Sequence, residues 1–502
     1  MNVLWILSDQ HNPRFTGCYG HPFAQTPHID ALAASGLRFE QAWCPSPLCV
    51  PCRASLFTGR YVFEHGCWDN CIAWDGRLPG WPAHLADHGV HLTTIGKLDF
   101  APGQHRIAEP ILPAYRTSRD IHSLFRADTT LPPRWQEADH LAQAGPRDGL
   151  TLEKTGGWQI AERACRWLAA DRPADRPWIL NVNFLEPHPP WPCPPDLWEK
   201  WQNRVQLKDL PPLYFEPPEN LHPFHRNYAH HSTGLYTAPE EVLRGYIAYL
   251  VHCEIVDTLV GRVLSQLAAL NLLEDTLVIY SSDHGENCRA HGQWGKMNMY
   301  EEALRVPLIL AGPPVPPAAR GTVIAAPVEL LDVLPTACAA AGAPLPADLR
   351  GVSLLPLLQN PAAPPPHEYV FSEYHANGAP AGAFAVSDGR WKYVECVGAR
   401  GMLFDLAADR DELHDLLAAP PAARPAAQEF QTVVARLRGW LCRLLSPVAV
   451  DLRAKQDQAH LRRAMERDGT LADEIFNRGY ERRADTLVPR ANRPAAQRAQ
   501  PS

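Results

Sequence analysis

The chain has 502 residues, of which 46% are hydrophobic and 20% are charged, and this balance excludes a disordered, collagen-like or coiled-coil protein. The formal net charge of −8 argues against a nucleic-acid-binding protein, because such proteins present a basic surface. The odd count of 13 cysteines argues against a complete disulfide framework, and the length predicts one large domain with a smaller one.

The amino-terminal residues do not have the pattern of an export signal. Residues 1–10 lack a cationic start, and their apolar stretch is too short for the core of a signal peptide. The most apolar later region, 323–344, is interrupted by Glu329 and Asp332, which argues against a membrane-spanning helix. The sequence therefore predicts a cytoplasmic protein that has neither a membrane nor a nucleic acid as its partner.

Short apolar runs predict buried strands at residues 3–7, 92–95, 178–184, 276–280 and 306–310. Segments with helical spacing alternate with these runs, and they lie at 28–39, 152–169 and 240–270. This alternation predicts an α/β fold, in which a large mixed, mostly parallel sheet is sandwiched by helices on both faces.

The composition changes after residue 360. Residues 360–366 are rich in proline and alanine and predict a linker, so we expect a first domain at 1–360. An Asp-Gly turn signal at 388–389 lies between two apolar runs and predicts a β-hairpin, which a helix follows at 433–445. These elements predict a small C-terminal α+β domain at 367–445. The remaining residues, 446–502, are expected to form a partly helical extension with a frayed end.

Two of the predicted strands end in clusters of polar residues. Ser8-Asp9-Gln10-His11 follows the first strand, and Ser281-Ser282-Asp283-His284-Gly285-Glu286 follows the fourth. In open α/β sheets, ligands bind at the carboxyl ends of the strands. The sequence therefore predicts a functional site at this edge.

The most informative segment is 49–60, Cys-Val-Pro-Cys-Arg-Ala-Ser-Leu-Phe-Thr-Gly-Arg. A helix beginning at Cys49, with Arg53 one turn later, favours a nearby anion. The pattern Cys-x-Pro-x-Arg resembles the signature of the type I sulfatases of the alkaline-phosphatase superfamily, in which this cysteine is oxidised to formylglycine. Only Cys49 has proline at +2 and arginine at +4, whereas Cys52 stands where that family usually has serine or alanine. We expect the other twelve cysteines to remain ordinary thiols.

The resemblance runs from residue 1 to about residue 417 and implies a metal site. Matched by position, its ligands are Asp9, Gln10, Asp283, His284 and the modified Cys49. Mostly oxygen donors suit a hard cation, so Ca²⁺ is expected, while the nitrogen of His284 leaves Mn²⁺ or another divalent ion open.

The same resemblance implies four groups that act on the sulfate: Arg53, Lys97, His188 and Lys296. One hydroxyl of the hydrated formylglycine is expected to attack sulfur, and the second then expels sulfate. The three cations would hold the sulfuryl oxygens, and His188 would protonate the departing alcohol.

One departure from the family pattern suggests the substrate. Most sulfatases have histidine two residues after the Gly-Lys pair, but here Lys97-Leu98 is followed by Asp99. This variant resembles the glucuronate 2-sulfatase branch, so 2-O-sulfated uronates are the expected substrate class. Asn70, Asp99 and His105 are the candidate substrate-binding residues.

Two other functions stay open at this stage. A formylglycine-dependent phosphonate monoester hydrolase or phosphodiesterase would share the metal ligands, but such enzymes tend to carry tyrosine and threonine in place of Gly-Lys, so Lys97 favours sulfate esters. A metal-binding interaction protein without turnover is the second alternative. The expected partners are a small sulfated substrate and a formylglycine-generating enzyme, and a homo-oligomer is left open.

Overall fold

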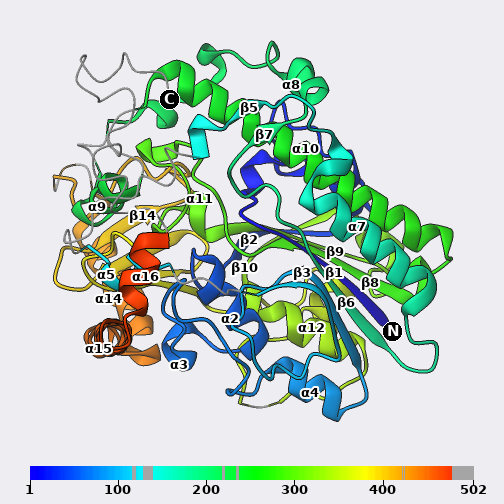
Figure 1. Cartoon of the computed structure of the whole chain (residues 1–502). Helices are drawn as coiled ribbons and strands as arrows, with labels where there is room; N and C mark the ends of the chain where they lie inside the picture. Colours follow the sequence, from blue (N-terminus) through cyan, green and yellow to red (C-terminus); the bar gives the residue numbers. More distant parts are fainter. Residues whose placement is uncertain are drawn as a thin grey trace.

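The computed structural model describes residues 1–115, 120–127, 140–217, 221–232, 237–346, 348–420, 422 and 424–477. An eight-stranded sheet with the order β10-β2-β9-β8-β1-β6-β3-β4 crosses the molecule (Figure 1). Its strands are β1 (Asn2–Ser8), β2 (Gly36–Trp43), β3 (His91–Lys97), β4 (Glu109–Ala114), β6 (Trp178–Asn183), β8 (Thr276–Ser282), β9 (Arg305–Ala311) and β10 (Thr322–Glu329).

The pairing confirms a mixed, mostly parallel sheet. Strands β8, β1, β6, β3 and β4 are mutually parallel, and β10 is parallel to β2. Only β9 runs antiparallel to both of its neighbours, β8 and β2. All five predicted strands are present, with slightly different ends.

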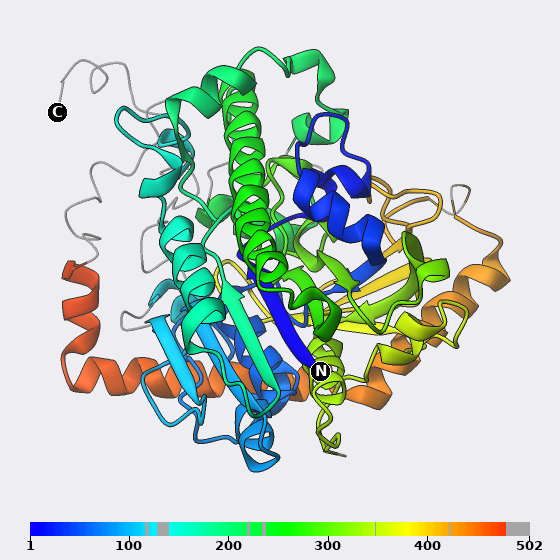
Figure 2. The same cartoon turned by 90° about the vertical axis from the view of Figure 1, so that its right-hand side faces the viewer.

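Helices cover both faces of the sheet, as Figures 1 and 2 show. One face carries α1 (Pro27–Ser35), α7 (Gly156–Arg166) and α10 (Pro239–Ala269), and the other carries α2 (Cys49–Thr58), α4 (Trp81–Asp87) and α12 (Val333–Ala340). Alternate side chains of β1 divide between the two cores: Trp5 packs with α2, and Ile6 packs in the core that α10 completes. Each fully buried side chain of this size contributes roughly 1.5–3 kcal/mol to folding.

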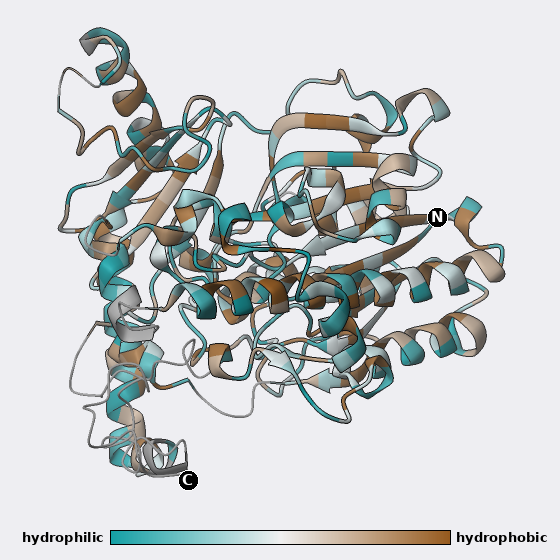
Figure 3. Ribbon diagram, turned by 90° about the horizontal axis from the view of Figure 1, so that it is seen from above, coloured by the Kyte–Doolittle hydropathy of each residue, from teal (hydrophilic) through white to brown (hydrophobic). Residues whose placement is uncertain are grey.

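The remaining elements are short or peripheral. They are α3 (Val62–His65), α5 (His122–Phe125), β5 (Gly145–Pro146), β7 (Pro192–Cys193), α8 (Pro195–Trp201), α9 (Pro223–Ser232), α11 (Glu301–Leu304) and α13 (Leu355–Gln359). Figure 3 shows hydrophobic and hydrophilic residues alternating along the helices, as expected for helices with one buried face. None of the described helices is long and apolar enough to span a bilayer.

The predicted helix at 28–39 is wrong in its last four residues. Helix α1 ends at Ser35, and β2 begins at Gly36. Apolar Leu37 and Phe39 alternate with polar Arg38 and Glu40, which is the period of a strand rather than a helix. Close approach also requires glycine here, because a Cβ atom on Gly36 would lie 2.2 Å from the carbonyl oxygen of Leu310 in β9.

A second, antiparallel sheet follows the linker, and its strands are β11 (Val370–Tyr374), β12 (Ala383–Ser387), β13 (Trp391–Cys396) and β14 (Met402–Asp405). The predicted hairpin is β12–β13. Helix α14 (Ala427–Leu444) packs on this sheet, and α15 (Pro447–Arg467) and α16 (Thr470–Asn477) follow it. The division into domains stays a prediction, and residues 478–502 lie outside the described part.

Candidate active site

The carboxyl ends of β1 and β8 lie side by side, and they place the predicted metal ligands together. Ser8 pairs with Ser282, so Asp9 and Asp283 leave the sheet next to each other. The amino-terminal turn of α2 brings Cys49 to the same point. The candidate ligand atoms of Asp9, Cys49, Asp283 and His284 all lie within 4.8 Å of one another, and the four side chains are buried.

Cys49 lies at the centre of this group. Its Sγ atom is 3.2 Å from Nε2 of His284 and 3.9 Å from Oδ1 of Asp9. Pro51 is tolerated in the first turn of α2 because a helix leaves its first N–H groups unpaired. Asn70 Oδ1 accepts one of these, the Val50 N–H, at 3.1 Å. The structure thus places Asn70 beside Cys49, where it fixes the start of the helix.

Gln10 is held between a carboxylate and a lysine. Its backbone is in the left-handed region, with φ of 67°, and its N–H donates to Asp283 Oδ1 at 3.1 Å. The side-chain amide donates to Glu286 and accepts from Lys296 through its oxygen. Glu286 is anchored in turn by the N–H groups of Cys288 (2.8 Å) and Gly295 (2.6 Å). Sequence reasoning assigned no role to Glu286, although it directly follows Asp-His-Gly.

Two of the predicted cations, Arg53 and Lys97, contact the aspartates, while the third, Lys296, contacts Gln10. Arg53 Nε donates to Asp283 Oδ2 at 2.9 Å, and its Nη2 donates to Asp9 Oδ2 at 3.3 Å. Lys97 pairs with Asp9 and lies 3.2 Å from Asp99 Oδ2. A further residue missed in the sequence, Asn183 at the end of β6, accepts from Arg53 Nη1 at 3.3 Å.

The electrostatics of the site favour anions at its centre. Burial opposes ionisation of the Cys49 thiol, but the cations of Lys296 and Lys97 outweigh it and lower its pKa to about 6. Burial also opposes ionisation of Asp9, but Lys97 and other cations hold its pKa well below the ordinary value. Burial raises the pKa of Asp283 despite Arg53.

His188 lies at the edge of this group, and with Lys97 it lines a cavity of about 320 Å³. Its Nδ1–H donates to the carbonyl oxygen of Pro189 at 2.5 Å, so Nε2 is the nitrogen left for a substrate. Burial and the charge of Lys296 hold the pKa of His188 well below its ordinary value. The imidazole is therefore neutral before an anion binds, and an anionic substrate would favour its protonation.

The structure does not bring every predicted residue to the cluster. Asp99 joins it through Lys97, but His105 packs among aromatic side chains. Its Nε2 is 3.2 Å from the carbonyl oxygen of Trp74, and its ring stacks on Tyr115 with centroids 5.8 Å apart. These contacts are those of a core histidine.

The donor set fits a divalent cation. Two carboxylates and the amide oxygen of Gln10 are hard ligands, and His284 adds one nitrogen. Nδ1 of His284 donates to the carbonyl oxygen of Gly285 at 3.0 Å, which fixes the ring and turns Nε2 toward Cys49 and the aspartates.

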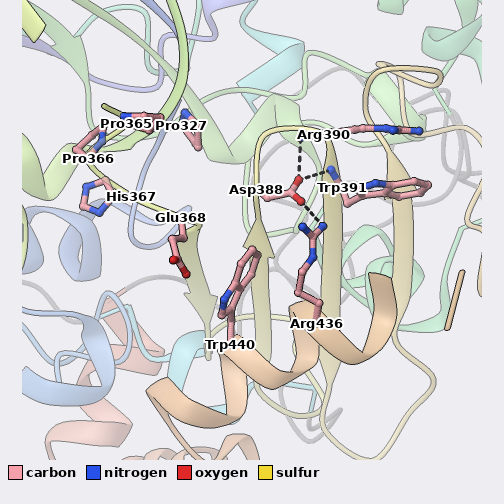
Figure 4. Close-up of a pocket in the computed structure, with 10 residues that line it drawn as sticks. All are labelled: Pro327, Pro365, Pro366, His367, Glu368, Asp388, Arg390, Trp391, Arg436 and Trp440. Carbon is pink, nitrogen blue, oxygen red and sulfur yellow. Dashed lines mark hydrogen bonds and ion pairs between the residues drawn. The ribbon is translucent and has the colours of Figure 1, made fainter. Parts of the chain in front are cut away.

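A larger cavity, of about 720 Å³, lies away from these residues (Figure 4). It is bordered by the linker, the β12–β13 turn and α14. Its polar side chains pair with the chain itself: Arg436 with Asp388, and Arg390 with Asp405 at 2.9 Å. None of the predicted site residues lines it.

Comparison with known proteins agrees with the geometry at the strand ends. The sulfatase family model matches residues 1–343, and a model described as N-sulphoglucosamine sulphohydrolase, C-terminal, matches 289–438. The chain is 29% identical to arylsulfatase K of Canis lupus familiaris over 441 residues, which cover 83% of this chain and 78% of that relative. It is 30% identical to a choline-sulfatase of Rhizobium meliloti (strain 1021) over 448 residues, which cover 84% and 83%.

A solved structure gives the same architecture. The phosphonate monoester hydrolase of Agrobacterium radiobacter has a TM-score of 0.69 and 24% identity, and the match covers 88% of this chain and 95% of that one. This likeness confirms the alkaline-phosphatase-like fold. The sulfatase model covers well over half of the sequence, so the chain belongs to the sulfatase family and is a hydrolase of sulfuric esters.

Proposed function

We propose that the protein cleaves sulfate monoesters with a formylglycine derived from Cys49 and a divalent cation, Ca²⁺ in the first instance. The observation that carries this proposal is the position of Cys49. Its sulfur lies within 4 Å of both metal-ligand candidates Asp9 and His284, and the cations of Lys296 and Lys97 lower the pKa of the thiol. A side chain in this position can act on a group that the cation and the lysines hold together.

The residues of the chain divide the work in this mechanism. Asp9, Gln10, Asp283 and His284 would hold the cation, which supplies Lewis-acid activation when it is bound. Formylglycine, in its hydrated form, supplies one hydroxyl for attack on sulfur and one for release of sulfate. Arg53 would hold the Oδ2 atoms of Asp9 and Asp283 in place. Lys97 and Lys296 would bind the sulfuryl oxygens as negative charge develops on them.

The leaving alcohol takes its proton from His188 in this proposal. The bound sulfate ester brings negative charge close to a neutral imidazole and raises its pKa, so Nε2 can carry the proton to the leaving oxygen. Asp99, 3.2 Å from the ammonium group of Lys97, would act on the alcohol through that lysine. Sulfated uronates are the proposed substrate class, since the Lys-Leu-Asp sequence at this position resembles the uronate-sulfatase branch.

The test combines mass spectrometry with matched kinetics. The peptide that contains Cys49 should carry an aldehyde in active enzyme, after co-expression with a formylglycine-generating enzyme. Glucuronate 2-sulfate and 4-nitrophenyl sulfate should be hydrolysed faster than a phenylphosphonate monoester. Active enzyme in which Cys49 is wholly a thiol would overturn the formylglycine proposal, and a large preference for the phosphonate would overturn the choice of sulfate.

A further inference from the structure

The cavity that Lys97 and His188 line is also lined by residues that the proposed function does not use. Beyond these two side chains, its walls come from the loop before α7, the segment 185–192 and α10. Its volume of about 320 Å³ lies within the range of small-molecule sites, which is about 300–1,000 Å³. Because Lys97 and His188 belong to both, a substrate whose sulfate meets the lysines would place its alcohol part in this cavity.

Most of the rest of the wall is apolar, but three buried polar side chains interrupt it: Thr155, Glu186 and His252. Leu150, Leu185 and three prolines form the apolar part, and the Thr155 hydroxyl is already paired with the backbone of Leu152 and Trp158. Glu186 is 6% exposed and has one carboxyl oxygen, Oε2, without a hydrogen-bond partner. His252 is also 6% exposed, and its Nδ1 has no partner either.

Backbone hydrogen bonds orient both groups and leave one atom of each unpaired, Oε2 of Glu186 and Nδ1 of His252. The N–H of Gly157, in the first turn of α7, donates to Glu186 Oε1 at 3.2 Å. Position 157 must be glycine for the carboxyl group to lie there, because a Cβ atom would be 2.2 Å from Oε2. His252 donates its Nε2–H to the carbonyl oxygen of Pro192 at 3.1 Å, so Nδ1 carries a lone pair. Two acceptors that stay unpaired at this depth are costly unless a ligand supplies donors.

We propose that Glu186 and His252 are specificity-determining residues that accept hydrogen bonds from hydroxyl groups of the leaving alcohol, which is a hydroxylated ring such as a sugar. This inference rests on the proposed function and deepens it. A pyranose ring offers the apolar wall its C–H surface and offers the two acceptors its hydroxyl donors.

The same cavity disfavours a quaternary ammonium alcohol. Proteins bind such cations in cages of aromatic rings, and among the described residues that line this cavity there is no phenylalanine, tyrosine or tryptophan. Choline also has no N–H or ring hydroxyl to pair with Glu186 and His252, and any attraction of its cation to Glu186 is opposed by Lys97 in the same cavity. We therefore expect choline sulfate, the substrate in the name of the choline-sulfatase relative, to fit this cavity poorly.

The experiment compares three sulfate esters on the mature, metal-loaded enzyme: glucuronate 2-sulfate, choline sulfate and 4-nitrophenyl sulfate. For the wild type, kcat/KM on the sugar ester should exceed that on the choline ester by at least about 100-fold, since a site built for hydroxyl donors rejects a substrate that lacks them. The variant Glu186→Gln keeps the size of the side chain but replaces an acceptor by a donor. It should lower kcat/KM for the sugar ester about tenfold more than for the aryl ester.

Two further variants make the result decisive. His252→Leu removes the acceptor on α10 and should give the same selective loss, which keeps the test valid if Glu186→Gln does not fold. Glu162→Gln is the matched control, because Glu162 lies on the exposed side of α7 and pairs with Arg262. It should leave both rates unchanged.

The outcomes separate the inference from the function on which it rests. Because the backbone carbonyl of Glu186 accepts the N–H of Asp9 at 3.2 Å, an equal loss on all esters would mean that Glu186 acts only by positioning Asp9, and it would overturn the inference. Unchanged selectivity in both variants, or a wild-type preference for choline sulfate, would also overturn it while leaving the sulfatase function in place. A wild type that cleaves none of the three esters would overturn the proposed function itself.

Discussion

Two buried clusters of ionisable side chains in this protein have similar composition but different contacts. One is the site cluster, Asp9, Cys49, Asp283 and His284. The other, which we call the Glu302 cluster, consists of His291, Glu302 and Glu412, and its candidate ligand atoms also lie within 4.8 Å of one another. Both are fully enclosed, so burial alone does not tell a metal site from an internal ion-pair network.

The difference lies in what each carboxylate faces. In the Glu302 cluster the acids are neutralised by the chain: Arg14 lies 3.2 Å from Glu302, and Lys392 pairs with Glu412. Burial alone would raise the pKa of Glu302, but Arg14 and His291 lower it to about 2. A cation that entered this cluster would have to displace charges that are already in place.

In the site cluster the cations occupy only one side of the acids. Arg53 contacts the Oδ2 atoms of both Asp9 and Asp283, whereas their Oδ1 atoms face His284 at 4.0 and 3.7 Å. Among the described residues, no lysine or arginine pairs with these Oδ1 atoms, which leaves that edge of each carboxylate for a cation. The two clusters are nevertheless connected along the chain, because Lys296 lies in the loop between His291 and Glu302, whose Nε2 and Oε2 atoms are 3.6 Å apart.

The largest effect is expected at Cys49. Replacement by alanine removes the proposed precursor of formylglycine, and it should reduce kcat for sulfate esters by at least about 10³-fold. Cys52→Ser is the matched control, since Cys52 lies one turn later and donates to the carbonyl oxygen of Asp283 at 2.8 Å, a bond that serine can also make. If Cys49→Ala turned over sulfate esters as fast as the wild type, the site cluster would not be the catalytic site.

Metal removal should separate the two clusters next. Dialysis against a chelator should abolish activity, and Ca²⁺ or Mn²⁺ should restore it. In calorimetric titrations, Asp283→Asn should lose the tight divalent-ion site because it loses a charged ligand. Glu302→Gln should keep that site. Loss of metal binding in Glu302→Gln alone would show that the assignment of the two clusters is reversed.

The Glu302 cluster should matter for stability rather than for metal binding. Glu302→Gln leaves the charges of Arg14 and His291 without their shared partner and should lower the free energy of unfolding by about 3–5 kcal/mol. Glu162→Gln breaks an exposed pair and should cost at most about 1 kcal/mol. Urea denaturation of both variants and the wild type measures the difference, and equal small losses would contradict a structural role for Glu302.

These two clusters also show which buried residues can be predicted from the sequence and which cannot. The site ligands follow strands or begin a helix, so local motifs found Asp9, Cys49 and Asp283. The Glu302 cluster and its partner Arg14 join residues that are far apart in the sequence, from Arg14 to Glu412, and no local pattern indicates such pairing.

The strands of the fold were likewise predicted where their local pattern was strong and missed where it was weak. Continuous apolar runs gave the central strands, but β4 alternates half-buried and exposed residues at the sheet edge and contains Pro110 and Pro113, so its pattern is weak. Strand β2 directly continues from α1, where helical and strand periods are hard to separate over a few residues. Asn183 and Glu286 were not assigned to the site because their roles depend on contacts with Arg53 and Gln10.

The smallest expected effect is a pH dependence that comes from the Glu302 cluster. Burial disfavours the charged form of His291, but the hydrogen bond from its Nδ1–H to Glu216 and the negative charge of Glu302 raise its pKa to about 9 from an ordinary value of 6.5. A raised pKa stabilises the fold fully below pH 6.5, and this stabilisation is lost as the pH rises through 9. The shift corresponds to about 3 kcal/mol at most.

His291→Gln should be less stable than the wild type at pH 6, and it should lose less stability than the wild type between pH 6.5 and 9. Parallel pH profiles of unfolding for the two proteins would show that His291 does not carry a proton in the folded state, and the internal charge balance that distinguishes the Glu302 cluster from the site cluster would then fail.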